Sequence, residues 1–123
     1  MPTSEVRIPR QWDVMVGDVV VLPFPYADRL AEKRRPAVVV SLPSLAQKHG
    51  IVWVVMVTSA ENAGWPGDVG ISDLDEAGLT SPSVVRPAKI ATVDLTRVLR
   101  VIGRLPAADT AALTAELRSI TGL

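Results

Sequence analysis

The chain contains no cysteine and few aromatic residues: three tryptophans, one tyrosine and one phenylalanine among 123 residues. The lack of cysteine excludes disulfides, thiolate zinc sites and cysteine nucleophiles. It also agrees with a reducing compartment, so the cytoplasm is the expected location. A chain of this length forms one domain of ordinary size that buries a core without cross-links.

Long apolar runs are also missing. The longest, from Ile51 to Val57, is far shorter than the roughly 20 residues that a membrane-spanning helix needs. The N-terminus lacks the apolar core of a signal peptide. We therefore expect a protein that is neither exported nor embedded in a membrane.

Net charge is zero, with 13 basic and 13 acidic residues, which argues against broad, non-specific attraction to nucleic acid. The charge is nevertheless unevenly distributed. Residues 1–50, 51–82, 83–107 and 108–123 carry formal charges of +2, −5, +4 and −1. A basic zone will form beside an acidic one if the two basic segments meet in space.

Short runs rich in β-branched residues dominate the chain and are separated by Pro, Gly, Ser and Asp. This pattern is typical of a small all-β barrel rather than a parallel sheet with crossover helices. The expected strands are Asp18–Leu22, Ala37–Ser41, Ile51–Thr58, Asp68–Ile71, Val84–Arg86, Lys89–Val93 and Val98–Gly103.

The C-terminus differs from the rest. Leu113, Leu117 and Ile120 recur at helical spacing between Pro106, suited to a first turn, and Gly122, suited to a helix end. We predict one amphipathic helix packed on the barrel, within a single domain over residues 16–123. Residues 1–15 show no periodicity and are interpreted as an N-terminal arm.

Two expected strands place a cation and a hydroxyl at corresponding ends. If the stretches 33–41 and 51–59 form an antiparallel hairpin through a turn-rich stretch at 42–50, pairing Ser41 with Val52 puts Arg35 opposite Thr58. A guanidinium offers a planar fork of donors and the hydroxyl adds another. The pair therefore suits an oxyanion or a phosphate.

An ordered set of motifs supports a more specific interpretation. The motifs are GDVVVLPFPY at 17–26, KRRPAVVVS at 33–41, VTS at 57–59, SPSVVRPAKIATVD at 81–94 and VIGRL at 101–105. Together they resemble the MazF/PemK toxins of bacterial type II toxin–antitoxin systems, over roughly residues 16–117.

This resemblance implies an SH3-like barrel of the CcdB/MazF type with a C-terminal helix, assembled as a homodimer. It also implies a metal-independent, cofactor-free endoribonuclease that cleaves single-stranded RNA, usually mRNA, and is inhibited by a cognate antitoxin. Arg35 and Thr58 match the family's catalytic pair. Arg86 matches an arginine that also serves the site in one branch.

The implied reaction is attack of a ribose 2′-hydroxyl on its own 3′-phosphate, which needs alignment and charge stabilisation rather than a metal. Arg35 is expected to hold the phosphate oxygens, with Thr58 and Ser59 as hydroxyl donors. A guanidinium stays protonated, so the general base is left open between Asp28 and Glu32.

RNA binding needs stacking surfaces and phosphate contacts. The candidates are aromatic, basic or hydroxyl side chains near these motifs: Phe24, Tyr26, Arg29, Lys33, Arg34, Ser59, Arg86 and Lys89.

Structural alternatives apply to several candidates. Arg35 alone suits an ion pair with Asp28 or Glu32, and Thr58 an ordinary strand end. The alternative for Arg86 is that of a strand residue that pairs with the acidic segment 51–82. Four further residues are expected to lie outside the catalytic site: Phe24 and Trp53 in the core, His49 in a turn, and Trp65 at a dimer or partner surface.

Two alternatives to a ribonuclease remain open. One is a non-catalytic barrel toxin that acts on a protein, as gyrase-inhibiting relatives do. The other is an inactive family member, because Ala88 stands where one branch of the family carries an aspartate linked to proton transfer.

Overall fold

The computed structural model describes the backbone of residues 14–25 and 32–123, and the side chains of 14–23 and 33–123. The strands are β1 (Asp18–Pro25), β2 (Glu32–Val39), β3 (Ile51–Ser59), β4 (Val69–Gly70), β5 (Ser83–Asp94) and β6 (Arg100–Arg104). The helices are α1 (Pro43–His49), α2 (Leu74–Ala77) and α3 (Ala107–Thr121), with 3₁₀ turns η1 (Ala60–Asn62) and η2 (Leu95–Arg97).

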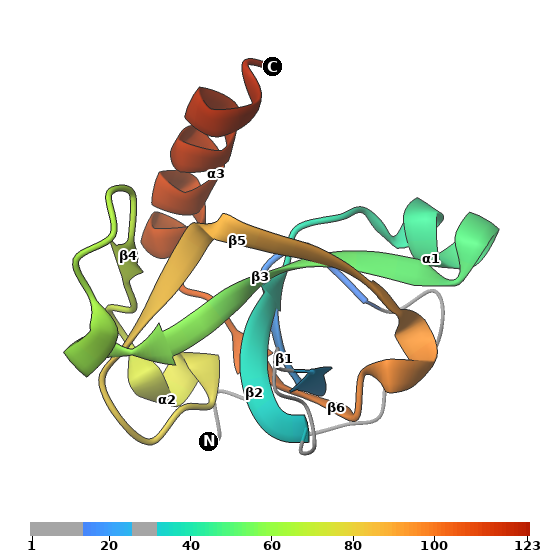
Figure 1. Cartoon of the computed structure of the whole chain (residues 1–123), viewed down its shortest axis with the longest axis horizontal. Coiled ribbons are helices and arrows are strands. Elements are labelled where there is room, and N and C mark those ends of the chain that lie inside the picture. Colours follow the sequence, from blue (N-terminus) through green and yellow to red (C-terminus); the bar gives the residue numbers. More distant parts are fainter. Residues whose placement is uncertain (1–13, 26–31) are drawn as a thin grey trace.

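The six described strands form one antiparallel sheet in the order β4-β5-β3-β2-β1-β6. The sheet curls into a half-barrel (Figure 1). Helix α3 packs near β4 and β5, whereas α1 packs beside β3. The mainly β class with a C-terminal helix is therefore confirmed.

Each face of the sheet has its own apolar cluster, because successive side chains of a strand point to opposite faces. The first cluster includes Val20, Leu22, Ala37, Val39, Val52 and Val54, with Ala46 of α1 packed against them. The second includes Val19, Val38, Val55, Val57 and Val85, covered by Ala77 of α2 and Leu113 of α3. The curled sheet is thus buried on both sides along its middle.

The stretch 42–50, predicted as a turn, contains helix α1 instead. Pro43 occupies its first turn, where a missing N–H is tolerated. Gly50 ends it with a φ of 69° and donates its N–H to the Ala46 carbonyl. His49 therefore lies in a helix rather than in a turn.

Strand β2 starts at Glu32, earlier than the predicted start at Ala37. Its pairing with β1 runs from Val19↔Val38 to Pro25↔Glu32. Arg35 and Arg34 are consequently strand residues, paired with Leu22 and Pro23 of β1, and do not precede the strand as the predicted bounds had them.

The two predicted strands around 84–93 are one strand, β5, interrupted by a bulge. Met56 pairs with Arg86, but its neighbour Val55 pairs with Ile90. Residues 87–89 of β5 are thus left without partners in β3. A bulge of this kind bends the strand and changes the face to which its side chains point.

The burial of four further side chains can be compared with the predictions. Leu113 is buried as expected, while Ile120 is exposed. Trp53, predicted in the core, is 47% exposed. Val14, which the sequence placed in the arm, is buried in the first cluster.

Candidate functional site

Arg35 and Thr58 lie at facing positions of neighbouring strands. The ladder between β2 and β3 pairs Val39 with Val54 and Ala37 with Met56, which is the predicted register. Continuing it by two residues sets Arg35 opposite Thr58. Directly opposite residues of an antiparallel pair share a face, so the cation and the hydroxyl are on the same side of the sheet.

A cleft of about 420 Å³ lies where these strands end. Four of the predicted site residues line it, namely Arg34, Arg35, Thr58 and Ser59. Residues that the sequence had not singled out complete its polar lining: Thr80, Ser81, Ser83 and Arg100.

Arg100 comes to the cleft through the order of the strands. Val21 of β1 pairs with Pro36 of β2 on one side and with Arg100 of β6 on the other. The first basic segment of the sequence therefore meets the second at this cleft. The uneven charge was a signal for this meeting, but the residue was not identifiable without the pairing of β6 with β1.

The lining of the cleft can bind an anion. Three guanidinium groups supply rigid forks of donors, and the neighbouring hydroxyls supply further donors. Because a phosphodiester carries one negative charge and two free oxygens, this lining suits a nucleic-acid backbone. No group of three or more metal-ligating side chains suited to a metal ion occurs in the described part of the chain.

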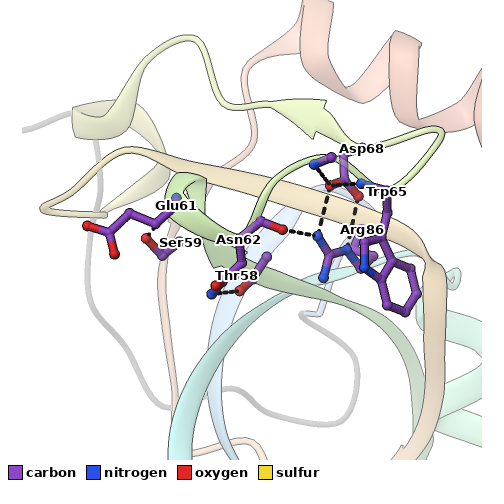
Figure 2. Close-up of polar contacts among 8 residues, drawn as sticks. Thr58, Ser59, Glu61, Asn62, Trp65, Asp68 and Arg86 are labelled. Carbon is purple, nitrogen blue, oxygen red and sulfur yellow. Dashed lines mark hydrogen bonds and ion pairs between the residues drawn. The ribbon is translucent and has the colours of Figure 1, made fainter.

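A second set of contacts, drawn in Figure 2, begins at Thr58. The side-chain amide of Asn62 in η1 donates to the Thr58 hydroxyl oxygen at 3.2 Å. The main-chain carbonyl oxygen of Asn62 in turn accepts a hydrogen bond from Arg86 Nη2 at 2.7 Å. Ser59 accepts from the Glu61 N–H at 3.2 Å and so caps the same turn.

Arg86 is 8% exposed and forms a two-pronged ion pair with Asp68. Its Nε lies 3.0 Å from Oδ1 and its Nη2 lies 2.9 Å from Oδ2. Hydrogen bonds from Arg86 lower the pKa of Asp68, against the opposing effect of burial, and the same bonds raise the pKa of Arg86. Arg86 thus takes its alternative role as the ion-pair partner of a carboxylate in the acidic segment. It is connected to Thr58 through Asn62.

The remaining candidates lie elsewhere. Lys33 is exposed on β2, and Lys89 lies over the Trp65 ring with its Nζ 5.4 Å from the centroid. Tyr26 and Arg29 fall outside the described residues, as do the side chains of Phe24 and both candidate bases, Asp28 and Glu32. Their predicted roles stay predictions.

Comparison with known proteins identifies the class of protein to which this fold belongs. A curled antiparallel sheet with a C-terminal helix is the architecture of MazF toxins. The chain superposes on MazF from Deinococcus radiodurans with a TM-score of 0.72 and 26% identity, covering 95% of this chain and 99% of that one.

Two further structures show the same fold. MazE-MazF from D. radiodurans matches with a TM-score of 0.68 and 24% identity, covering 95% of this chain and 98% of that one. The Mycobacterium tuberculosis toxin MazF-mt6 matches with a TM-score of 0.68 and 22% identity, covering 86% of this chain and 97% of that one. No curated protein sequence gives a significant match.

The family model for the PemK-like, MazF-like toxin of type II toxin–antitoxin systems matches residues 15–121. The chain therefore belongs to this toxin family. No helix among the described residues is long and apolar enough to cross a membrane.

Proposed function

We propose that this toxin is an endoribonuclease that cuts single-stranded RNA, mRNA in particular, in the cytoplasm and thereby stops translation and growth. The observation that carries the proposal is the β2–β3 register, which aligns Arg35 with Thr58 beside a cleft of cations and hydroxyls. Family membership supports it, since a related mycobacterial structure is described as an endoribonuclease with its cognate antitoxin.

In the proposed reaction the ribose 2′-oxygen forms a bond to phosphorus and loses its proton to a base. The bond from phosphorus to the 5′-oxygen breaks, and that oxygen takes up a proton. The products are a cyclic phosphate and a free 5′-hydroxyl. Arg35 holds the non-bridging oxygens, and Thr58 donates to the charge that develops there.

The lining of the cleft supports the binding of adjacent phosphates as well. Arg34 and Ser59 alternate with Arg35 and Thr58 along their strands, so they lie on the opposite face. Arg100 and Ser83 pair with residues of that second face. A strand of RNA that passes around the ends of β2 and β3 therefore meets donors on both sides.

The test is incubation of purified, antitoxin-free protein with a long single-stranded RNA in chelator. Arg35→Ala, Arg35→Lys and Thr58→Ala are compared with Lys48→Ala, a control on α1. We expect discrete cuts with 5′-hydroxyl ends from wild type and the control, and loss of cleavage on the order of 100-fold in Arg35→Ala and Thr58→Ala. Arg35→Lys also loses activity, because an ammonium cannot make the bidentate contact.

Absence of RNA cleavage would favour one of the two alternatives to a ribonuclease. Growth arrest by a folded wild-type protein that cuts none of several RNAs indicates a toxin that acts by binding a protein. Absence of both growth arrest and cleavage indicates an inactive member, as Ala88 suggested. Unchanged toxicity of Arg35→Lys beside unchanged cleavage would also contradict the catalytic role of Arg35.

Partners follow from the same family. A cognate antitoxin is supported by the matched structure of MazE-MazF. For self-association, an apolar groove of about 320 Å³ lies between α3 and the sheet, lined in part by Trp53, Ile90, Leu117 and Leu123. Trp53, Ile90 and Leu123 are 47%, 51% and 96% exposed.

A second copy of the chain is the proposed occupant of this groove, because soluble monomers seldom leave clustered large apolar side chains in water. Ile90→Glu places a charge there and is expected to convert a dimer into a monomer in light scattering. Leu42→Glu, at an exposed leucine on α1's flank, is the control. A wild-type monomer at micromolar concentration would contradict the proposed dimer.

A further inference from the structure

Trp65 is an exposed aromatic residue held in a fixed position. It lies between η1 and β4 and is 45% exposed. The N–H groups of Gly64 and Trp65 both donate to Asp68 Oδ2, each at 3.3 Å, and the Asp68 N–H donates to the Trp65 carbonyl at 3.1 Å. One carboxylate thus closes the tight loop that carries the indole.

The indole ring lies against two cations. The Arg86 guanidinium carbon is 4.3 Å from the ring centroid and Lys89 Nζ is 5.4 Å from it. Arg86 is fixed by Asp68 and by the Asn62 carbonyl. A cation over the ring face stabilises this arrangement, so these contacts favour the orientation of the indole seen in the structure.

The same contacts connect the indole to the proposed catalytic hydroxyl. Arg86 touches both the Trp65 ring and Asn62, and Asn62 donates to Thr58. Figure 2 shows the tryptophan, the arginine and the threonine within one continuous network. The ring is therefore linked to the hydroxyl by a continuous chain of contacts, in which the Arg86 bond to Asn62 is partly buried and the Asn62–Thr58 bond is exposed.

We propose that Trp65 is a stacking platform for one unpaired base of the bound RNA, beside the phosphate that is cut. This inference rests on the proposed ribonuclease function and adds a subsite to it. Unpaired bases stack on exposed aromatic rings. Lys89, next to the ring, is placed to meet the phosphate of the stacked nucleotide.

The experiment compares kcat and KM for the mapped RNA among wild type, Trp65→Phe and Trp65→Leu. Leu42→Ala, which removes another exposed apolar side chain, is the control. Loss of one stacking contact should raise KM on the order of tenfold in Trp65→Leu. Trp65→Phe keeps an aromatic face and should stay within about threefold of wild type, as should kcat in all variants.

Fluorescence provides a readout independent of turnover. The double variant Trp12→Phe/Trp53→Phe leaves Trp65 as the sole tryptophan. An RNA with 2′-deoxyribose at the cleavage position binds without being cut. Stacking of a base should quench Trp65 emission as this RNA saturates the protein.

The possible outcomes test the stacking role of Trp65 separately from the proposed ribonuclease activity. If wild type and Leu42→Ala cut RNA and folded Trp65→Leu has an unchanged KM, the platform is wrong while the ribonuclease stands. If Trp65→Leu binds RNA normally but binds antitoxin weakly, the platform is wrong and the ring serves the protein partner. If wild type neither binds nor cuts RNA, both proposals are wrong.

Discussion

Asn62 donates a hydrogen bond to the hydroxyl oxygen of Thr58 at 3.2 Å. A hydroxyl group that accepts such a bond keeps its own hydrogen available for another acceptor. In the proposed reaction, Asn62 would therefore leave Thr58 as a donor toward the RNA. The Arg86 bond to the main-chain carbonyl of Asn62 holds the asparagine in place.

Removal of Asn62 is expected to slow cleavage through Thr58. Asn62→Ala should lower kcat roughly tenfold, because the hydroxyl then rotates freely. In a Thr58→Ala background the same change should have no further effect, since the group on which it acts is gone. Equal losses in both backgrounds would show that Asn62 acts on the fold or on RNA directly.

An isosteric change at the same residue reverses the hydrogen bond. Asn62→Asp replaces the donating amide with a carboxylate that only accepts, so the Thr58 hydrogen is drawn away from the substrate. Single-turnover cleavage by Asn62→Asp should therefore be slower than by Asn62→Ala. A faster rate for Asn62→Asp would exclude this orienting role.

The Asp68–Arg86 ion pair predicts a pH-dependent stability. The folded-state pKa of Asp68 is lowered from 3.8, so the folded protein binds fewer protons there than the unfolded chain. The contribution is complete above about pH 5 and disappears as pH falls through the folded-state pKa. Urea unfolding should show Asp68→Asn less stable than wild type at pH 7, with the gap closing below pH 4.

A control distinguishes this effect from general acid sensitivity. Asp75→Asn changes a first-turn carboxylate of α2 that has no ion pair among those found in the described residues. Its unfolding curve should follow that of wild type closely from pH 7 to pH 4. A pH-independent gap for Asp68→Asn would show that the carboxylate acts through loop geometry alone.

Arg100 is expected to contribute one phosphate contact. Arg100→Ala should weaken RNA binding at low salt and reduce the slope of log affinity against log salt by about 0.7, the value for one contact on a single strand. Lys48→Ala, remote from the cleft, should leave the slope unchanged. Binding isotherms at four salt concentrations provide the measurement, and equal slopes for wild type and Arg100→Ala would remove Arg100 from the site.

Gly78 ends α2 and lines the cleft. Its φ is +76°, and a Cβ placed there would overlap the carbonyl of Ile102 in β6. Gly78→Ala should therefore destabilise the protein by more than the roughly 1–2 kcal/mol of left-handed strain alone. Gly50 has a φ of +69° with nothing within 4 Å, so Gly50→Ala isolates the strain, and similar unfolding midpoints for both variants would contradict the overlap.

The predictable part of the site followed from local pattern. Alternation and β-branching indicated the strands, and the register that sets Arg35 opposite Thr58 came from closing the hairpin with Ser41 opposite Val52, in line with the observed ladder. Arg100 and Asn62 were not predictable in this way. Arg100 depends on β6 lying beside β1, and the role of Asn62 depends on how a 3₁₀ turn folds back over a strand end.

The sequence predictions that the structure contradicts have specific physical causes. The α1 segment is short and begins with a proline, a residue that reads as a turn signal from sequence. Trp53 lies in the middle of an apolar strand, which predicts burial. It is exposed because it projects from β3 at a place that no described helix covers fully.

The bulge in β5 separates two lengths of strand with independent registers. Before it, Val85 pairs with Val57 beside the cleft, and beyond it Ile90 pairs with Val55 and reaches the apolar groove. Residues 87–89 belong to neither ladder. A change of length within these three residues therefore leaves both ladders in register and shifts Lys89 relative to Trp65, so the end of the strand beside the cleft and the end beside the apolar groove are positioned independently.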